Sequence, residues 1–316
     1  MTDFTIGNGA AAVWKNLDEN SEKLIRAYSS RISHVYDAAK LMIRELGDGG
    51  SDRLIKDLLT DESVRSRIFE SELFASAARA HETSDVFPKN GNFDMMCFCR
   101  ALTENEKYTP AQLSEIMLGQ GAAPSPPEEK KIALLKNAQA SRAFELFAAN
   151  IRNAMYVYED NFSDACEAVF EDRANFAVIP LSSSSDGRLD GLYRMMEKYS
   201  LTVNMTCGIS SPDGSMTRFA LAGKSFSPTF SGGRAKFEIK ITLSEPSKIS
   251  EILEAAEFFG ATTDSLDSLP DIFGRGDAFG MIFDIENADA TGLITYLSLK
   301  FSQFITIGIY PHITEE

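Results

Sequence analysis

The sequence has few of the residues that usually bind metals or carry out nucleophilic and redox chemistry, with four cysteines and three histidines in 316 residues. Cys97 and Cys99 form a Cys-x-Cys pair, but no further ligands lie nearby to complete a zinc site. His34, His81 and His312 stand alone in the sequence, and no Ser/His/Asp or Cys/His arrangement is present. We therefore expect no metal and no cofactor.

Long apolar runs and an excess of positive charge are also absent. No apolar run reaches the length that spans a bilayer, and the first residues lack the basic and then apolar regions of a secretory signal. The formal net charge of −15 opposes binding to a phosphate backbone. The P-loop and the dinucleotide-binding glycine pattern are missing. We expect a cytoplasmic protein that binds neither membranes nor nucleic acid.

The first third of the chain is predicted to be all helix. Apolar residues recur at helical spacing over 19–46, and further helical patterns follow up to residue 118. Thr109 and Pro110 supply the N-cap and the first position of the last of these helices. The Pro-rich stretch 121–130 is expected to be a linker that ends a helical domain at residue 120.

Strands and helices alternate over residues 131–225, which predicts βαβ units on a largely parallel sheet. After a second linker at 226–234, residues 235–316 follow the order strand, helix, strand, strand, helix, strand, which is the ferredoxin-like βαββαβ arrangement. The predicted fold class is a multi-domain α/β protein. It has an N-terminal all-α domain, a central βαβ domain like one lobe of a periplasmic binding protein, and a ferredoxin-like C-terminal domain.

A motif in the central domain resembles a known family. The segment 162–201 contains FAVIPLSSSSDGRLDGLY, in which Pro180, Ser184 and Gly187 fall where the prephenate dehydratases have Pro, Ser and Gly. That family closes its catalytic domain with a Thr-Arg-Phe strand, which is present here at 217–219.

The C-terminal domain adds to the resemblance. Dehydratases carry a regulatory ACT domain of βαββαβ order after the Thr-Arg-Phe strand, and its last strand ends in Gly-x-Tyr-Pro. Here that sequence is Gly308-Ile309-Tyr310-Pro311. The resemblance implies that residues 235–316 form an ACT-like domain.

The resemblance also implies roles for single residues. Prephenate loses water and CO2 to give phenylpyruvate, and Thr217 would supply the proton to the leaving hydroxyl group. Arg218, Phe219, Ser184 and Ser141 would bind the substrate, a small carboxylate. In the ACT-like domain, Ser247, Ile249 and Ser268 occupy the positions of the motifs that bind an amino-acid effector.

The N-terminal helix is similar to the opening helix of the chorismate mutases that are fused to some dehydratases. Arg31 would then take the place of an arginine that binds a substrate carboxylate through its planar guanidinium group. This resemblance implies a possible mutase activity in residues 1–120.

Of the departures of this sequence from the dehydratase pattern, one matters most for the active site. The family places its second catalytic lobe before the Thr-Arg-Phe strand, where this chain has only the four-residue turn 211–214. Three interpretations stay open: a lyase of phenylalanine biosynthesis, a catalytically inactive relative that binds a small molecule, and a subunit that works with a separate catalytic chain. A homodimer is expected because a four-stranded ACT-like sheet leaves an edge open.

Overall fold

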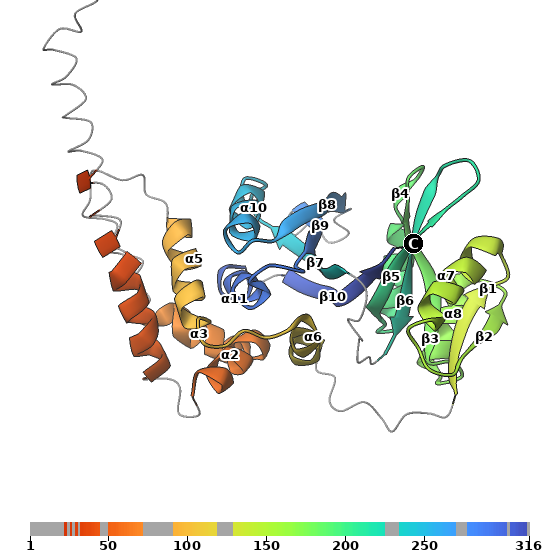
Figure 1. Cartoon of the computed structure of the whole chain (residues 1–316), viewed down its shortest axis with the longest axis horizontal. Helices are drawn as coiled ribbons and strands as arrows, with labels where there is room; N and C mark the ends of the chain where they lie inside the picture. Colours follow the sequence, from red (N-terminus) through yellow and green to blue (C-terminus); the bar gives the residue numbers. More distant parts are fainter. Residues whose placement is uncertain are drawn as a thin grey trace, which may run out of the picture. The chain divides into compact units, whose positions relative to one another are not determined.

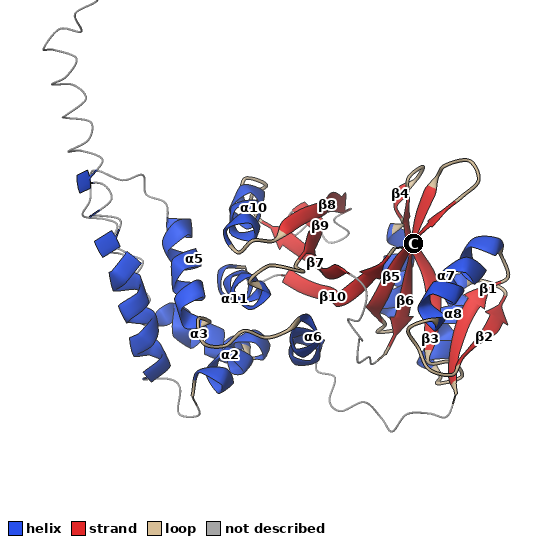
Figure 2. Cartoon of the chain, viewed as in Figure 1, coloured by secondary structure: helices blue, strands red, loops and turns tan. Residues whose placement is uncertain are grey.

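The computed structural model describes residues 22–23, 26, 29–30, 32–44, 50–71, 91–118, 129–224, 234–269, 277–301 and 304–314. The chain forms two compact units. One holds Met1–Asp57 and Asp61–Asn105, and the other holds Leu58–Thr60 and Glu106–Glu316. We describe each unit by itself (Figures 1 and 2).

The first unit is helical in all its described secondary structure, as the apolar spacing predicts. Residues 32–44 are helical within the long helix expected at 19–46. The further helices are α2 (Ser51–Thr60), α3 (Glu62–Glu70) and α5 (Gly91–Leu102). Asp61 caps α3 by accepting a hydrogen bond from the backbone N–H of Ser63. Arg31, the expected carboxylate ligand, lies outside the described residues.

Helix α6 (Pro110–Leu118) begins as the sequence predicts. The Thr109 hydroxyl accepts from the backbone N–H of Gln112, and the Gln112 side chain accepts from the backbone N–H of Thr109. This reciprocal pair is a capping box with Pro110 at the first helical position. We expected α6 in the N-terminal domain, but it belongs to the second unit, where it packs on β10 (Phe304–Ile313).

The second unit contains one continuous mixed sheet in the order β2-β1-β3-β6-β5-β10-β7-β9-β8. Its first part comprises β1 (Lys130–Leu135), α7 (Ala138–Ala148), β2 (Ala154–Glu159), α8 (Phe162–Phe170), β3 (Phe176–Ser183), β4 (Gly187–Arg188), α9 (Asp190–Lys198), β5 (Thr202–Ser210) and β6 (Met216–Gly223). The second part comprises β7 (Arg234–Leu243), α10 (Lys248–Phe258), β8 (Thr262–Leu269), β9 (Asp277–Asp284), α11 (Ala290–Lys300) and β10.

The parallel pairing that the βαβ rhythm predicts holds for β1, β2 and β3 only. Strands β5 and β6 form an antiparallel hairpin, and β6 also pairs antiparallel with β3. The expectation of a largely parallel sheet is therefore wrong for this half. The turn at Ser211–Gly214 connects β5 directly to β6, which leaves too few residues for a crossover between parallel strands.

Two apolar cores cover the two faces of this half of the sheet. Helix α7 packs on one face, where Phe147 lies in the same apolar core as Val178 and Phe219. Helices α8 and α9 pack on the other face, where Val169 and Met196 meet alternate residues of the same strands. Because successive side chains of a strand point to opposite faces, this division fixes the direction of every side chain on β6.

Residues 234–313 have the strand and helix order that the sequence predicts, and β10, β7, β9 and β8 are neighbours in antiparallel pairs. Strand β10 joins this part to the first part of the sheet, because His312 and Ile313 pair in parallel with Thr206 and Cys207 of β5. The two halves of the second unit therefore share one sheet through β10 (Figure 2).

Gly308 is required where β10 approaches β5. A Cβ atom at this position would lie 2.7 Å from both the Val203 carbonyl oxygen and Cδ1 of Tyr310. We expect Gly308→Ala to lower the free energy of unfolding by about 1–3 kcal/mol, as for overpacked core sites. Urea denaturation followed by circular dichroism measures this change.

Gly191→Ala in α9 is the matched control, because a Cβ there meets nothing within 4 Å and alanine favours the helix. Equal stability of the two variants would show that β10 does not need the close approach at Gly308.

Candidate functional site

A cavity lined by many polar and charged residues lies between the two halves of the second unit, and we call it the cleft. Its volume is about 440 Å³. Ser182, Ser183, Ser184, Gly187, Arg188, Thr206, Gly208, Met216 and Arg218 line one side, and Lys236, Asp264, Ser265, Asp267, Ile282 and His312 line the other. The βαββαβ half therefore forms the wall of the cleft that faces the central strands.

This arrangement bears on the lobe that the sequence lacks. The turn at 211–214 leaves no room for a second lobe between β5 and β6, as the sequence indicates. Instead, the strands that follow residue 234 form a facing wall within the same chain.

Glu238 of β7 holds the two sides of the cleft together. Its side chain is fully buried, and Oε1 accepts from Arg188 Nη1 at 3.1 Å and from the Tyr193 hydroxyl at 2.7 Å. Oε2 accepts from the Tyr310 hydroxyl, and Arg218 Nη2 lies 3.7 Å from Oε1. A buried carboxylate is stable only when charges and hydrogen bonds compensate it, and here four side chains do so.

The groups around Glu238 are fixed by close packing. The Arg188 guanidinium lies 3.5 Å from the ring centroid of Tyr193 and also pairs with Asp190 at 3.2 Å. A Cβ on Gly280 would come within 2.8 Å of Arg188 Nη1, so only glycine leaves room for this arginine. Burial and the nearby Glu238 carboxylate raise the pKa of Tyr193 above its ordinary value, so Tyr193 stays a hydrogen-bond donor.

Lys236 and His312 lie on the facing wall of the cleft. Lys236 Nζ pairs with Asp264 and with Asp284, the latter at 2.9 Å. His312 Nδ1 lies 2.9 Å from the Thr206 hydroxyl. Burial, together with the positive charges of Lys236 and Arg218, lowers the pKa of His312 to about 4. The imidazole is therefore neutral at pH 7 and cannot serve there as a strong acid.

Among the residues that the structure describes, two that line the cleft carry a buried donor without a hydrogen-bond partner. Arg218 Nε is buried and unpaired, although the Arg218 Nη2 atom donates to the Tyr193 hydroxyl at 2.6 Å. The Ser265 hydroxyl is likewise buried without a partner. An unsatisfied buried donor is costly, so each of these groups would gain from an acceptor supplied by a ligand.

The structure separates the residues of the Thr-Arg-Phe motif. Arg218 lines the cleft together with Met216, two residues before it. Thr217 and Phe219 alternate with these residues, so they point to the face covered by α7, where Phe219 lies in the apolar core. Thr217 is buried and does not line the cleft.

Of the other predicted ligand-binding residues, Ser184 lies in the cleft. Its hydroxyl accepts from the backbone N–H of Met216 at 2.9 Å. Ser141 lies in the first turn of α7 and does not line the cleft. Ser247 and Ile249 lie at the start of α10 and Ser268 lies on β8, and none of the three lines the cleft or the second cavity described below.

Sequence reasoning missed Glu238, Lys236 and Tyr193, and it assigned no function to His312. One signal was present in β7, because Lys236, Glu238 and Lys240 alternate with Phe237, Ile239 and Ile241. Charged residues at every second position of a strand indicate one polar face. No sequence feature indicated that this face would meet Arg188 and Arg218 of the other half.

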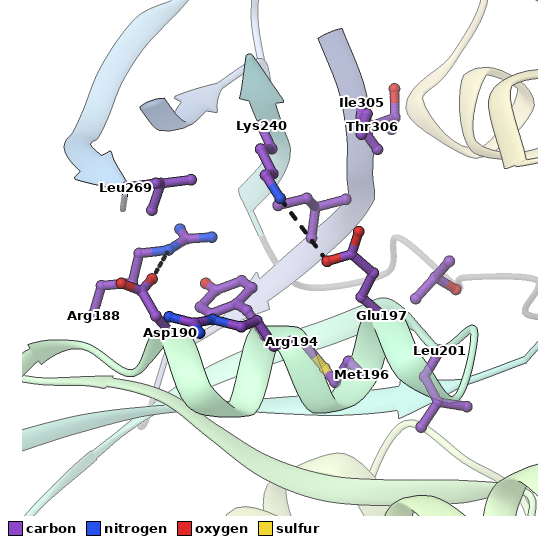
Figure 3. A pocket seen from close by; sticks show the side chains of 13 residues that line it. Arg188, Asp190, Arg194, Met196, Glu197, Leu201, Lys240, Leu269, Ile305 and Thr306 are labelled. Atoms are coloured by element: carbon purple, nitrogen blue, oxygen red, sulfur yellow. Dashed lines mark hydrogen bonds and ion pairs between the residues drawn. The ribbon is translucent and has the colours of Figure 1, made fainter. Parts of the chain in front are cut away.

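A second, smaller cavity lies between α9 and the strands β7 and β10, and Figure 3 shows it. Its volume is about 150 Å³. Lys240 and Glu197 form a loose ion pair of 3.9 Å across it, while Leu269 and Ile305 contribute apolar surface. Arg188 lines both cavities.

The residues that the structure describes contain neither a metal-binding cluster nor a membrane-spanning helix. No group of three or more His, Cys, Asp or Glu side chains is placed to hold a metal ion in that part of the chain. No helix there combines the length and apolar character needed to cross a bilayer.

No protein-family model and no curated protein matches the sequence. Among solved structures, prephenate dehydratase from Streptococcus mutans aligns at 18% identity and a TM-score of 0.49, covering 58% of this chain and 99% of that one. A structure described as GqqA, a novel type of quorum quenching acylase, aligns at 17% identity and a TM-score of 0.46. The alignment covers 57% of this chain and 94% of that one. Prephenate dehydratase from Arthrobacter aurescens in complex with L-Phe aligns at 12% identity and a TM-score of 0.44. The alignment covers 57% of this chain and 90% of that one.

The central role of Glu238 gives a first prediction for this site. Glu238→Gln leaves Arg188 and Arg218 without a buried counter-charge and should lower the free energy of unfolding by about 3–5 kcal/mol. Urea denaturation measures the change. Glu197→Gln is the control, because Glu197 is 67% exposed in its loose pair with Lys240. That variant should change stability by less than about 1 kcal/mol. Similar effects of both substitutions would contradict the role of Glu238.

His312 gives a second prediction, on pH dependence. Its pKa is lowered from 6.5 to about 4 in the folded protein, so its contribution to stability is complete above pH 6.5 and is lost as the pH falls toward 4. Between pH 7 and 4.5 this loss amounts to about 2 kcal/mol.

The His312→Asn variant should lose less stability than wild type over this interval, measured from urea midpoints at both pH values. His34→Asn is the control, because the hydrogen bond of His34 to Ser30 is exposed. An unchanged pH dependence in His312→Asn would show that His312 titrates normally.

Proposed function

We propose that this chain is a divergent relative of the prephenate dehydratases whose cleft binds a small carboxylate of the prephenate or phenylalanine class. The resemblance of residues 162–201 and 217–219 to that family supports the choice of ligand class. The observation that carries the proposal is that Arg218 lines the cleft while its buried Nε has no hydrogen-bond partner among the described residues. A guanidinium N–H donates strong hydrogen bonds to carboxylates.

The other charges in the cleft leave Arg218 as the group suited to a ligand carboxylate. Lys236 already pairs with two aspartates, and Arg188 makes the closer contact with Glu238. Arg218 Nη2 lies 3.7 Å from the same carboxylate, so Glu238 neutralises the charge of Arg218 less than that of Arg188. Ser265, on the facing wall, supplies a second unpaired donor for the ligand.

The residues 235–316 have a different role in this proposal from the one their sequence motifs imply. We propose that this ACT-like domain forms a wall of the ligand site through Lys236, Ser265 and His312. The expected effector residues Ser247, Ile249 and Ser268 stay predictions from the resemblance alone.

The cleft favours binding over dehydration. Loss of the prephenate hydroxyl group requires a proton donor beside it. Thr217 points to the opposite face of β6, and the neutral imidazole of His312 is a poor acid. The hydroxyl groups that line the cleft are weak acids and face it without a closed, water-free environment.

Dehydration of prephenate is the second candidate function, and one observation favours it. Thr217 pairs with Ser183 across β3 and β6, so the Thr-Arg-Phe motif adjoins the serine-rich segment in space as well as in the family pattern. The test is whether the purified chain forms phenylpyruvate from prephenate. Activity that is lost in the Thr217→Ala variant would show that the chain is a dehydratase and not only a binding protein.

Isothermal titration calorimetry with prephenate, phenylpyruvate and L-phenylalanine tests the binding proposal. Loss of a hydrogen bond to a charged group costs about 1.5–3 kcal/mol, so Arg218→Gln should raise the Kd about 10- to 100-fold. Ser265→Ala should raise it less, by about 2- to 10-fold, because a neutral donor is lost.

Ser265→Ala also guards against misfolding, since the hydroxyl has no partner to lose within the protein. Arg142→Gln is the control, because Arg142 is exposed on α7 outside the cleft. The proposal fails if none of the three compounds binds at millimolar concentration, or if all variants bind as wild type does.

A further inference from the structure

The two edge strands of the described sheet differ sharply in their side chains. Strand β8 forms one edge, and its Asp264 and Asp267 place carboxylates along it. Strand β2 forms the other edge and has the sequence AMYVYE. Charged residues on an edge oppose pairing with another strand, whereas an apolar edge invites it.

Strand β2 exposes large apolar and aromatic side chains on both faces. Met155 is 50% exposed, Tyr156 54%, Val157 36% and Tyr158 44%. These four residues make up half of the exposed large hydrophobic residues in the part of the chain that the structure describes. A contiguous exposed apolar patch of this kind marks an interaction surface.

The charges at the two ends of β2 identify its partner. Arg152 precedes the strand, and Glu159 and Asp160 end it, with Arg152 and Asp160 both exposed. A parallel partner strand of the same sequence would place like charges together. An antiparallel copy places the basic start of each strand opposite the acidic end of the other.

We propose that β2 pairs antiparallel with β2 of a second copy of this chain and continues the sheet across a two-fold axis. Opposed residues of an antiparallel pair point to the same face, so the register that fits is centred on Tyr156. In this register Met155 lies opposite Val157 of the second copy, and Arg152, just before one strand, comes near Asp160, just after the other.

The packing around β2 fits this pairing. Tyr156 lies against Phe144 of α7, with ring centroids 5.6 Å apart, and against Tyr158 at 4.9 Å. The two-fold axis therefore extends this aromatic cluster on the α7 face into the second copy. The net charge of −15 opposes self-association of the whole chain, so the complementary ends of β2 provide the local attraction that pairing needs.

Charge reversal with sedimentation velocity or light scattering after size exclusion tests the pairing on the full chain. The wild type should be a dimer at micromolar concentration. Arg152→Asp and Asp160→Arg should each weaken the dimer at least 10-fold, because each sets like charges opposite one another at both ends of the ladder. The double variant should restore wild-type dimerisation.

Apolar substitutions separate this edge from the other one. Val157→Lys on β2 should give monomers, and Leu266→Lys on the β8 edge, where Leu266 is 42% exposed, should stay dimeric. Circular dichroism shows that each variant is folded. A monomeric wild type, a dimer that survives Val157→Lys, or a dimer lost only in Leu266→Lys overturns the proposal.

Discussion

The burial of the Glu238 carboxylate is the constraint on which the second unit depends. A charge with no access to solvent must be met by cations and hydrogen-bond donors, and those donors come from four other elements: β4, α9, β6 and β10. Arg188 and Arg218 belong to the central half of the unit, and Glu238 belongs to the βαββαβ half. The carboxylate thereby fixes how these two halves meet.

The position of the cleft follows from this contact. Arg188 and Arg218 contact Glu238, and the end of β3 at Ser182–Ser184 therefore faces β7, β8 and β10 across the cleft. Arg218 Nη2 donates to the Tyr193 hydroxyl, while Arg218 Nε is buried without a partner. The same residue therefore contributes to the contact between the two halves and to the proposed ligand site. A two-sided site thus arises in a chain that has no second lobe between β5 and β6.

Much of the fold could be predicted from periodicity and capping signals. The strands over 130–135, 176–183 and 262–269 and the cap of α6 follow from local sequence. The antiparallel β5–β6 hairpin contradicts the parallel prediction because a short turn outweighs the βαβ rhythm. The exposure of β2 was not predicted. An apolar sequence such as AMYVY is compatible with an edge strand and with a central strand, so it does not indicate which of the two β2 is.

The candidate site was harder to predict. The family resemblance singled out Ser184 and Arg218, which lie in the cleft, and Thr217 and Phe219, which the alternation of β6 turns to the other face. Glu238, Lys236 and His312 come from a segment whose contact with the central strands depends on tertiary pairing through β10. The local sequence pattern does not indicate which distant strands pair, so only the structure could show that these residues line the cleft.

The central claim is that Arg218 binds a ligand carboxylate in the cleft. NMR of the arginine Nε–H groups tests it most directly, with the Arg218 signal assigned from its loss in Arg218→Gln. On titration with phenylpyruvate or L-phenylalanine, the account predicts a downfield shift of the Arg218 Nε–H proton. An unmoved Arg218 signal while the ligand binds elsewhere would contradict the account.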